Sequence, residues 1–342
     1  MGTKITELLE SKELTTEDLR DKIIVVDAFN QLYMFLSSIR QPDGSLLKDS
    51  QGNVTSHLNG LFYRFTKLMQ YEIKFVFVFD GKPPELKLKE RERRAALKAE
   101  ATLKYEQARE VENIEEMKKY ASRTSKLTKD MISDVKELID ALGFPIIEAP
   151  SEGEAQAALL VKNKDAYASL SQDADSLLFG CPLVVKNLTL SGRKKLPNKL
   201  SYDTITPELI SLSDTLQQLN VDIDQLIVIA MLTGTDYNIG GIKGIGHKTA
   251  LKLVKEYNHD FERLFTDVKW VEFFSYDWKE VFNVIKHTET TNDYVLNFKD
   301  VDDEKVVEVL CKKHDFSEER VRKILETVHV RSKAQKGLGE WC

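Results

Sequence analysis

Four short runs of β-branched and aromatic residues, separated by helical patterns, constrain what this chain can fold into. Runs of this length and composition predict buried strands. The predicted strands are Ile23–Val26, Phe75–Phe79, Phe144–Ile147 and Tyr167–Ser171, and the predicted helices between them include 57–71, 127–142 and 154–161. The alternation predicts an α/β fold with a central, mostly parallel sheet and helices on both faces.

Acidic residues follow all four predicted strands. They are Asp27 after the first, Asp80 after the second, Glu152 and Glu154 after the third, and Asp173 and Asp175 after the fourth. A single acid after a strand is usually a turn or a helix cap, and Ser151–Glu154 fits a capping box. Ligands of parallel α/β sheets bind outside the carboxyl ends of the strands, so four such ends with acids predict one binding site.

The chemistry of this predicted site favours hard cations. Carboxylates packed side by side raise one another's pKa unless positive charge compensates them. Oxygen ligands, with no pairing of His and Cys, favour magnesium over zinc. We therefore expect two Mg²⁺ ions, with Mn²⁺ as a substitute, and phosphoryl chemistry in which the ions activate water and neutralise the scissile phosphate.

Charge is unevenly distributed along the chain. The net charge of −6 argues by itself against a polyanionic partner, but residues 82–129 contain fourteen Lys/Arg and nine Asp/Glu. This stretch has few large apolar residues, so we expect a charged helix, running to about Thr124, that stands away from the body of the protein. Lys87 and Arg94 are seven residues apart and share one face of it, while most of the other charges fit a solvated helix surface.

Composition excludes several other classes of protein. Hydrophobic residues make up 42% of the 342 residues, which is enough for a large core and too many for a disordered chain. The apolar runs have strand length, so no membrane span is expected. The N-terminus lacks the apolar segment of a secretory signal, and three scattered cysteines (Cys181, Cys311 and Cys342) form no disulfide framework. These features predict a reduced, cytosolic protein.

A glycine-rich turn follows a further helical pattern at 224–232. Gly244 and Gly246 precede a lysine-rich segment that begins with Lys248, and Lys243 lies just before them. Glycine lets backbone N–H groups approach a phosphate closely, and the N-terminus of the following helix favours negative charge. A glycine turn alone is more often a plain helix junction, but together with these lysines it predicts contact with the DNA backbone.

Five segments of the chain together resemble the structure-specific 5′ nucleases, and most closely the flap endonucleases of archaeal type. They are VVDAFNQLY (25–33), FVFDGKPPELK (77–87), EAPSEGEAQAA (148–158), SQDADSLLFG (171–180) and LTGTDYNIGGIKGIG (232–246), and the resemblance covers nearly the whole chain. It implies seven metal-site carboxylates, namely Asp27, Asp80, Glu152, Glu154, Asp173, Asp175 and Asp236. The positions of the predicted strands do not indicate the last of these.

The resemblance also implies roles for basic and aromatic residues. Lys87 and Arg94 would approach the scissile phosphate, with Arg91 and Arg93 as alternatives to Arg94. Tyr33 would stack on a base near the cut, a contact that tolerates any sequence.

The same resemblance divides the chain into regions. Gly244 and Gly246 match a helix–two-turn–helix element that grips duplex DNA around a monovalent cation, expected here to be K⁺, and the stretch 82–129 matches a helical arch through which a 5′ single strand passes. The expected regions are an N-terminal nuclease region (1–98), the arch and cap (82–140), an internal nuclease region (141–225), a helix–two-turn–helix DNA-binding region (226–260), a C-terminal helical region (261–330) and a tail (331–342).

The tail looks like a sliding-clamp peptide. Gln335, Leu338 and Trp341 have the spacing of a motif whose apolar side chains enter a groove on the clamp. Cys342 stands where a second aromatic residue is usual, and a frayed tail is the alternative interpretation. We expect binding to the sliding clamp (PCNA), in the cytoplasm of an archaeal cell, since no basic nuclear-targeting segment follows.

Together these features predict a Mg²⁺-dependent 5′ flap endonuclease. It would cut branched DNA where a 5′ single-stranded flap joins the duplex, leaving a 5′-phosphate and a 3′-hydroxyl, in replication (Okazaki fragment maturation) and repair, with 5′–3′ exonuclease activity besides. A related 5′ exonuclease or a bubble-cutting excision nuclease is the nearest alternative. A clamp-associated DNA-binding protein without catalysis is a different class, and the presence of all seven carboxylates argues against it.

Overall fold

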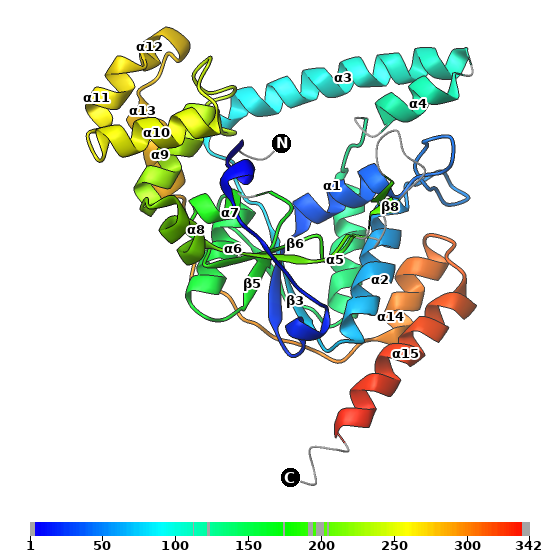
Figure 1. Ribbon diagram of the computed structural model, residues 1–342. Helices are drawn as coiled ribbons and strands as arrows, with labels where there is room; N and C mark the ends of the chain where they lie inside the picture. The colour runs from blue at the N-terminus through cyan, green and yellow to red at the C-terminus, as the bar shows by residue number, and fades with distance from the viewer. Residues whose placement is uncertain are drawn as a thin grey trace.

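A seven-stranded sheet forms the centre of the computed structural model, which describes residues 4–111, 113–121, 124–173, 175–190, 194–195, 202–203 and 205–336 (Figure 1). The strand order is β1-β9-β6-β5-β2-β3-β4. The strands from β6 to β4 run parallel, and β9 and β1 add an antiparallel edge. The fold is therefore α/β with a mostly parallel sheet, as predicted.

The strands and helices have the following bounds. The strands are β1 (Lys12–Glu13), β2 (Ile23–Asp27), β3 (Lys74–Phe79), β4 (Ile146–Glu148), β5 (Ala168–Leu170), β6 (Leu183–Lys186) and β9 (Glu208–Ser211), with a separate pair β7 (Lys194–Lys195) and β8 (Tyr202–Asp203). The helices up to the end of the sheet are α1 (Ala28–Ser38), α2 (Ser56–Met69), the 3₁₀ turn η3 (Glu85–Lys87), α3 (Leu88–Glu110), α4 (Ile114–Ala121), α5 (Lys129–Ala141), α6 (Gly153–Lys162) and α7 (Asp175–Leu178). The later helices are α8 (Leu212–Leu219), α9 (Ile223–Thr233), α10 (His247–Tyr257), α11 (Phe261–Asp267), α12 (Trp270–Phe273), α13 (Trp278–Lys286), α14 (Asp303–Val307) and α15 (Glu318–Lys336).

All four predicted strands are present, with small shifts at their ends. β4 begins two residues later than predicted, at Ile146. Pro145 has no N–H to donate to a sheet, although its carbonyl accepts a bond of 3.0 Å from the N–H of Phe77. Phe144 packs instead against Phe75 and Phe77, with ring centroids 5.6 and 5.8 Å away.

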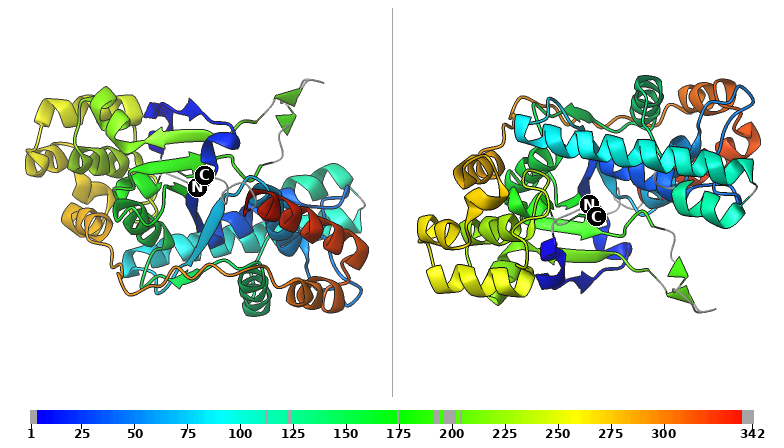
Figure 2. Two further views of the ribbon diagram at one scale, coloured as in Figure 1. Left: turned by 90° about the horizontal axis from the view of Figure 1, so that it is seen from below. Right: turned by 90° about the horizontal axis from the view of Figure 1, so that it is seen from above.

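The central strands are apolar throughout because both faces of the sheet are covered. Alternate residues of β2 enter two different cores: Val25 packs with α6 and α9, whereas Ile24 and Val26 pack with α1, α2 and α5. α14 and α15 belong to the second core, and α10 to α13 extend the first. Figure 2 shows the two groups at opposite ends of the sheet.

The charged stretch after β3 forms two helices rather than the single helix predicted to run to about Thr124. α3 ends at Glu110, and Asn113 starts α4, since its Oδ1 accepts a hydrogen bond of 3.2 Å from the N–H of Glu116. α4 then folds back beside α3, and the pair buries Ala108 and Met117 (Figure 1). As predicted, this stretch stands away from the body of the protein.

Across the described ranges, no helix is both long enough and apolar enough to cross a bilayer.

Candidate functional site

The carboxyl ends of β5, β2, β3 and β4 lie side by side at one edge of the sheet. β2 ends at Asp27, and Asp80 directly follows β3. Glu152 and Glu154 lie where the chain enters α6 after β4, and Asp175 is the first residue of α7 after β5. The acids of the four strand ends therefore share one edge, as the order of strands and helices predicts.

Asp80 caps the start of α6 from 73 residues away in the chain. Its Oδ1 accepts a hydrogen bond of 2.6 Å from the backbone N–H of Gly153. A Cβ at position 153 would lie 2.7 Å from the same oxygen, so the contact requires glycine. The capping box that Ser151–Glu154 would allow as the alternative to a metal site does not form: the N-cap side chain makes no capping bond, and Glu154 Oε1 accepts from Ser171 Oγ at 3.2 Å instead.

Two residues that were not predicted from the sequence also hold carboxylates in place. The backbone N–H of Asn30 donates to Asp27 Oδ1 at 2.9 Å, and its side-chain Nδ2 donates to Asp173 Oδ2 at 3.4 Å. Ser171 Oγ accepts from the N–H of Asp173 at 3.2 Å as well as donating to Glu154. The spacing from Asp27 to Asn30, that of an N-cap and its third residue, is the signal that could have indicated Asn30.

Burial and mutual repulsion oppose ionisation of these carboxyl groups. Burial, assisted by the charge of Asp80, raises the pKa of Asp27 to about 7. Burial also raises the pKa of Asp80 and of Glu152, and it raises that of Glu154 well above its usual value, with Asp175 as the strongest charged neighbour. Neighbouring carboxylates add to burial in raising the pKa of Asp27, Glu152 and Glu154, in the direction expected for packed acids.

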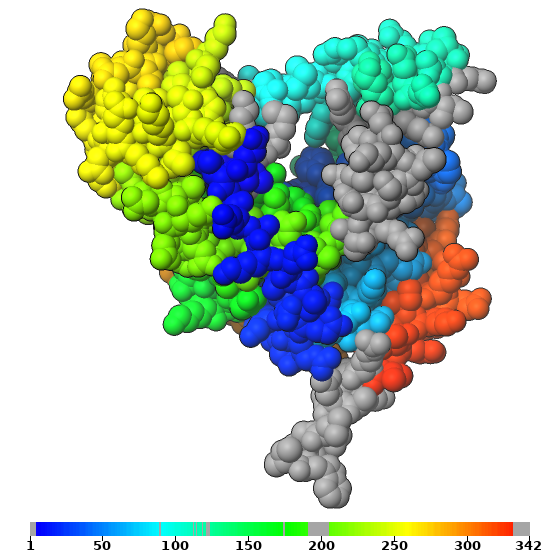
Figure 3. Space-filling view, in the orientation of Figure 1, coloured from blue at the N-terminus to red at the C-terminus, as the bar shows by residue number. Residues whose placement is uncertain are grey.

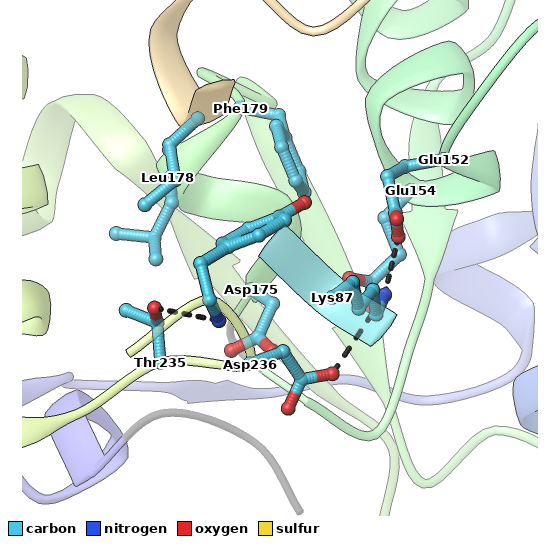
Figure 4. A pocket seen from close by; sticks show the side chains of 10 residues that line it. Lys87, Glu152, Glu154, Asp175, Leu178, Phe179, Thr235 and Asp236 are labelled. Atoms are coloured by element: carbon cyan, nitrogen blue, oxygen red, sulfur yellow. Dashed lines mark hydrogen bonds and ion pairs between the residues drawn. The ribbon is translucent and has the colours of Figure 1, made fainter. Parts of the chain in front are cut away.

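Lys87 bridges two carboxylates on opposite sides of the site (Figure 4). Its Nζ lies 2.5 Å from Glu152 Oε2 and 3.7 Å from Asp236 Oδ2. Burial lowers the pKa of Lys87, but the charges of Glu152 and Asp236 outweigh burial and raise it above its ordinary value. The ammonium group therefore stays charged and supplies part of the missing positive charge.

Arg94 reaches the same site from the base of α3. Its Nη2 lies 2.6 Å from Asp236 Oδ1, and its Nε lies 2.6 Å from Glu90 Oε1. Glu90, only 2% exposed, also accepts two hydrogen bonds of 2.7 Å from Arg93. Arg91, the other alternative, is exposed. Among the three arginines, Arg94 thus makes a direct contact with a site carboxylate.

Asp236 is carried to the site by the loop after α9, not by the sheet. Asn238, fully buried, organises this loop: its Oδ1 accepts from Thr235 Oγ1 and its Nδ2 donates to the carbonyl of Met231, each at 2.6 Å. The small pocket beside the loop is lined by Lys87, Glu152, Glu154, Asp175, Leu178, Phe179, Thr235, Asp236, Tyr237 and Ile285 (Figure 4).

The donor set fits a hard divalent cation in its chemistry. All seven carboxylates offer oxygen, and burial together with neighbouring negative charge raises the pKa of Asp27 and of Glu154, so a bound divalent ion would favour their ionised forms. Within the described part of the chain, no three His, Cys, Asp or Glu side chains converge closely enough to hold an ion as they stand. The ammonium of Lys87 lies between Glu152 and Asp236 instead.

α3 passes over this edge of the sheet and leaves an opening beneath it (Figure 3). Tyr33 of α1 lies 38% exposed, and Lys98 Nζ of α3 is 4.5 Å from the centre of its ring. Both residues line a second pocket, together with Asn30 and Gln172. The ring of Tyr33 is thus accessible beside the carboxylates.

The glycine turn before α10 leaves its backbone open. Gly244 has a φ of 89°, which favours glycine, and Gly246 is the N-cap of α10 with an ordinary φ of −92°. A Cβ on either residue would meet no protein atom within 4 Å, and Lys243 and Lys248 are exposed nearby. Nothing in the protein itself therefore requires glycine at position 246.

The predicted clamp peptide is not tested by the structure. Gln335 lies near the end of α15, where side chains are not described, and Leu338 and Trp341 lie outside the described residues.

Known proteins match this chain along nearly its whole length. The XPG N-terminal domain matches residues 3–101, and the XPG I-region matches residues 143–236. Flap endonuclease 1 of Thermococcus onnurineus is 48% identical over 336 residues, which is 98% of this chain and 97% of that protein. Flap endonuclease 1 of Pyrococcus abyssi is 49% identical over 336 residues, 98% and 96% of the two chains. The structure of flap endonuclease-1 from Methanococcus jannaschii covers 98% of this chain and 100% of its own, with 38% identity and a TM-score of 0.76.

Proposed function

The chain belongs to the flap endonuclease family, and we propose that its seven carboxylates hold two Mg²⁺ ions, which Mn²⁺ can replace. It is a structure-specific 5′ flap nuclease, a metal-dependent phosphodiester hydrolase that binds DNA. The proposed ligands are Asp27, Asp80, Glu152, Glu154, Asp173, Asp175 and Asp236. The gathering of acids from four adjacent strand ends at one edge is the observation that carries this proposal.

The chemistry divides between the ions and the side chains of the chain. Bound divalent ions would supply activation of the attacking water and neutralisation of charge at the scissile phosphate. Lys87 and Arg94 would exchange their carboxylate partners for oxygens of that phosphate, where charge develops during the reaction. Arg94 can bind two oxygens at once, and Glu90 anchors its guanidinium at the base of α3.

DNA would be held on both sides of the reacting phosphate. Tyr33 would stack on a base beneath α3, since its ring is accessible next to the carboxylates. Gly244 and Gly246, with Lys243 and Lys248, would bind the duplex backbone, with a K⁺ ion at the turn. The empty space around Gly246 supports the approach of an external phosphate.

The tail would join the enzyme to a sliding clamp. Gln335, Leu338 and Trp341 would bind PCNA, and the archaeal sources of the relatives favour the cytoplasm as the site of action.

Cleavage of a double-flap DNA labelled at its 5′ end, with Mg²⁺ and with chelator, tests the activity against its alternatives. Cutting at the flap junction that requires Mg²⁺ is expected, with little cutting of a matched single strand. Preferred cutting of nicked or blunt duplex would favour an exonuclease, and tight flap binding without cutting would favour the DNA-binding protein.

Asp173→Ala tests the metal site directly. This variant should lose cleavage while its affinity for flap DNA stays within a few-fold, because the carboxylate serves the ions and not the duplex. Asp300→Ala, an exposed acid far along the chain, is the matched control and should cleave normally. Undiminished cleavage by Asp173→Ala would remove that residue from the proposed site.

A further inference from the structure

Residues 288–302 form an extended connection, here called the strap, between α13 and α14. The strap has no helix or strand and runs the length of the sheet, from one group of C-terminal helices to the other (Figure 2). Near its end, the N–H of Lys299 donates to the carbonyl of Gly143 at 3.0 Å, and that of Asp302 donates to the carbonyl of Ala141 at 2.9 Å. The strap is therefore bound to the body of the protein before it reaches α14.

One buried contact ties the strap to α6. Gln156 is fully buried, and its Nε2 donates to the carbonyl of Thr291 at 2.8 Å. The N–H of Thr291 donates in turn to Gln156 Oε1, also at 2.8 Å. The side-chain amide thus pairs with both backbone groups of one residue, as a neighbouring strand would. Such a reciprocal pair sets both the distance and the orientation of its partners, since a shift in either breaks both bonds.

α6 is also the helix that presents two of the proposed metal ligands. Gln156 lies one helical turn after Glu152 and two residues after Glu154. The buried side of α6 includes Ala157 and Ala158, whose side chains are too small to interlock with the sheet and so resist sliding of the helix only weakly. A directional contact is therefore needed to set the position of the helix along its axis.

We propose that Gln156 is a positioning residue for phosphodiester cleavage, because its pairing with Thr291 sets the axial position of α6 and so of Glu152 and Glu154. The inference rests on the proposed function, in which these two glutamates hold metal ions. The bond from Gly153 to Asp80 fixes the first turn of α6 to the sheet, and the pair at Gln156 fixes the next turn to the strap. Displacement of α6 would move both glutamates together, away from ligands carried by other strands.

A second attachment of the strap to α6 provides the control. Asn163, the exposed C-cap residue of α6, donates from Nδ2 to Asn292 Oδ1 and to the hydroxyl of Tyr294, each at 3.0 Å. It joins the same two segments as Gln156 does, but at the end of the helix away from the glutamates. A general loosening of the strap should follow from changes at either residue, whereas displacement of the ligands should follow from Gln156 alone.

The test compares Gln156→Met, Gln156→Ala and Asn163→Ala with the wild-type full-length chain. Methionine keeps the volume of glutamine and removes both hydrogen bonds, so it separates the bonds from packing if the alanine variant fails to fold. Binding of Mn²⁺ is measured by calorimetry without DNA, and kcat and KM are measured with flap DNA. We expect Gln156→Met to raise the Kd for Mn²⁺ about tenfold and to lower kcat by a similar factor, as is typical of groups that orient metal ligands. KM for DNA should stay within about twofold.

Two outcomes would overturn the role of Gln156. One is a wild-type Kd for Mn²⁺ in folded Gln156→Met. The other is an equal loss of Mn²⁺ affinity in Asn163→Ala, which would assign the effect to attachment of the strap in general. Glu154→Gln distinguishes failure of the Gln156 inference from failure of the proposed metal site. If this variant binds Mn²⁺ as tightly as the wild type, the proposed metal site is wrong, and the inference about Gln156 is wrong with it.

Discussion

Replacement of Asp27 by Asn should stabilise the protein in the absence of metal ions while it abolishes cleavage. Burial and the charge of Asp80 raise the pKa of Asp27 from 3.8 to about 7. The folded state therefore binds a proton on the Asp27 carboxyl group more tightly than the unfolded state does. The free energy of unfolding falls as pH rises from about 4 to about 7, and above that range the protein carries the full cost of a buried, ionised Asp27. At about 1.4 kcal/mol for each of roughly three pH units, the penalty is about 4 kcal/mol at pH 8.

Asparagine removes the charge but keeps the local structure. Its Oδ1 can still accept from the N–H of Asn30, the bond of 2.9 Å that caps α1. We expect Asp27→Asn to be about 4 kcal/mol more stable than the wild type at pH 8 and between about 1 and 2 kcal/mol more stable at pH 5. With saturating Mn²⁺ the order should reverse, since the wild type gains more from an ion that binds the folded state.

Thermal unfolding in EDTA and in Mn²⁺, at pH 5 and pH 8, measures these differences. Asp300→Asn, an exposed acid on the strap, is the control and should show no comparable change. The reasoning is refuted if Asp27→Asn unfolds at or below the wild-type midpoint at pH 8 in EDTA. It is refuted equally if Mn²⁺ stabilises the variant as much as the wild type.

Three further changes test other parts of the molecule. Glu90→Gln should lower kcat about tenfold, because it frees the guanidinium of Arg94. In single-turnover kinetics, Glu90→Gln should add little to the loss caused by Arg94→Ala, since both changes act on one contact, and full additivity of the two losses would contradict this link. Gly246→Ala should leave the unfolding midpoint unchanged, as its Cβ meets no protein atom within 4 Å, yet weaken duplex binding several-fold in fluorescence anisotropy; unchanged binding would mean that no DNA backbone approaches there. Trp341→Ala should weaken binding to the clamp in calorimetry and spare cleavage without the clamp, and an unchanged affinity would remove the clamp-peptide interpretation.

The sheet and the strand-end acids could be predicted because their signals are local. The apolar runs of β2 and β3 are continuous, since both faces are buried, and Asp27 and Asp80 follow them directly. Parallel pairing then brings the acids to one edge whatever the details of the helices. Asp236 has no such signal, because it follows a helix and reaches the site through a loop organised by Asn238.

Contacts between distant parts of the chain were beyond prediction from periodicity. The Asp80–Gly153 bond spans 73 residues, and it replaces the local capping box that Ser151–Glu154 indicates. The charged stretch divides into α3 and α4 at a turn where the N–H of Asn113 donates to the carbonyl of Ala108 and its side chain caps α4, within a composition that favours helix throughout. In each case the hydrogen bond that distinguishes the observed local structure from the expected one leaves no periodic signal in the sequence.

The position of Lys87 couples the binding of metal ions to the binding of DNA, although the two ligands do not compete for the same atoms of the protein. In this structure its ammonium offsets the charges of Glu152 and Asp236. If a phosphate draws the lysine away, both carboxylates lose their counter-charge at that moment, and their demand for cations rises. Thermodynamic reciprocity then requires that metal ions tighten DNA binding by the same factor by which DNA tightens metal binding. We therefore expect metal ions to bind this site more tightly when a DNA strand is present than when it is absent.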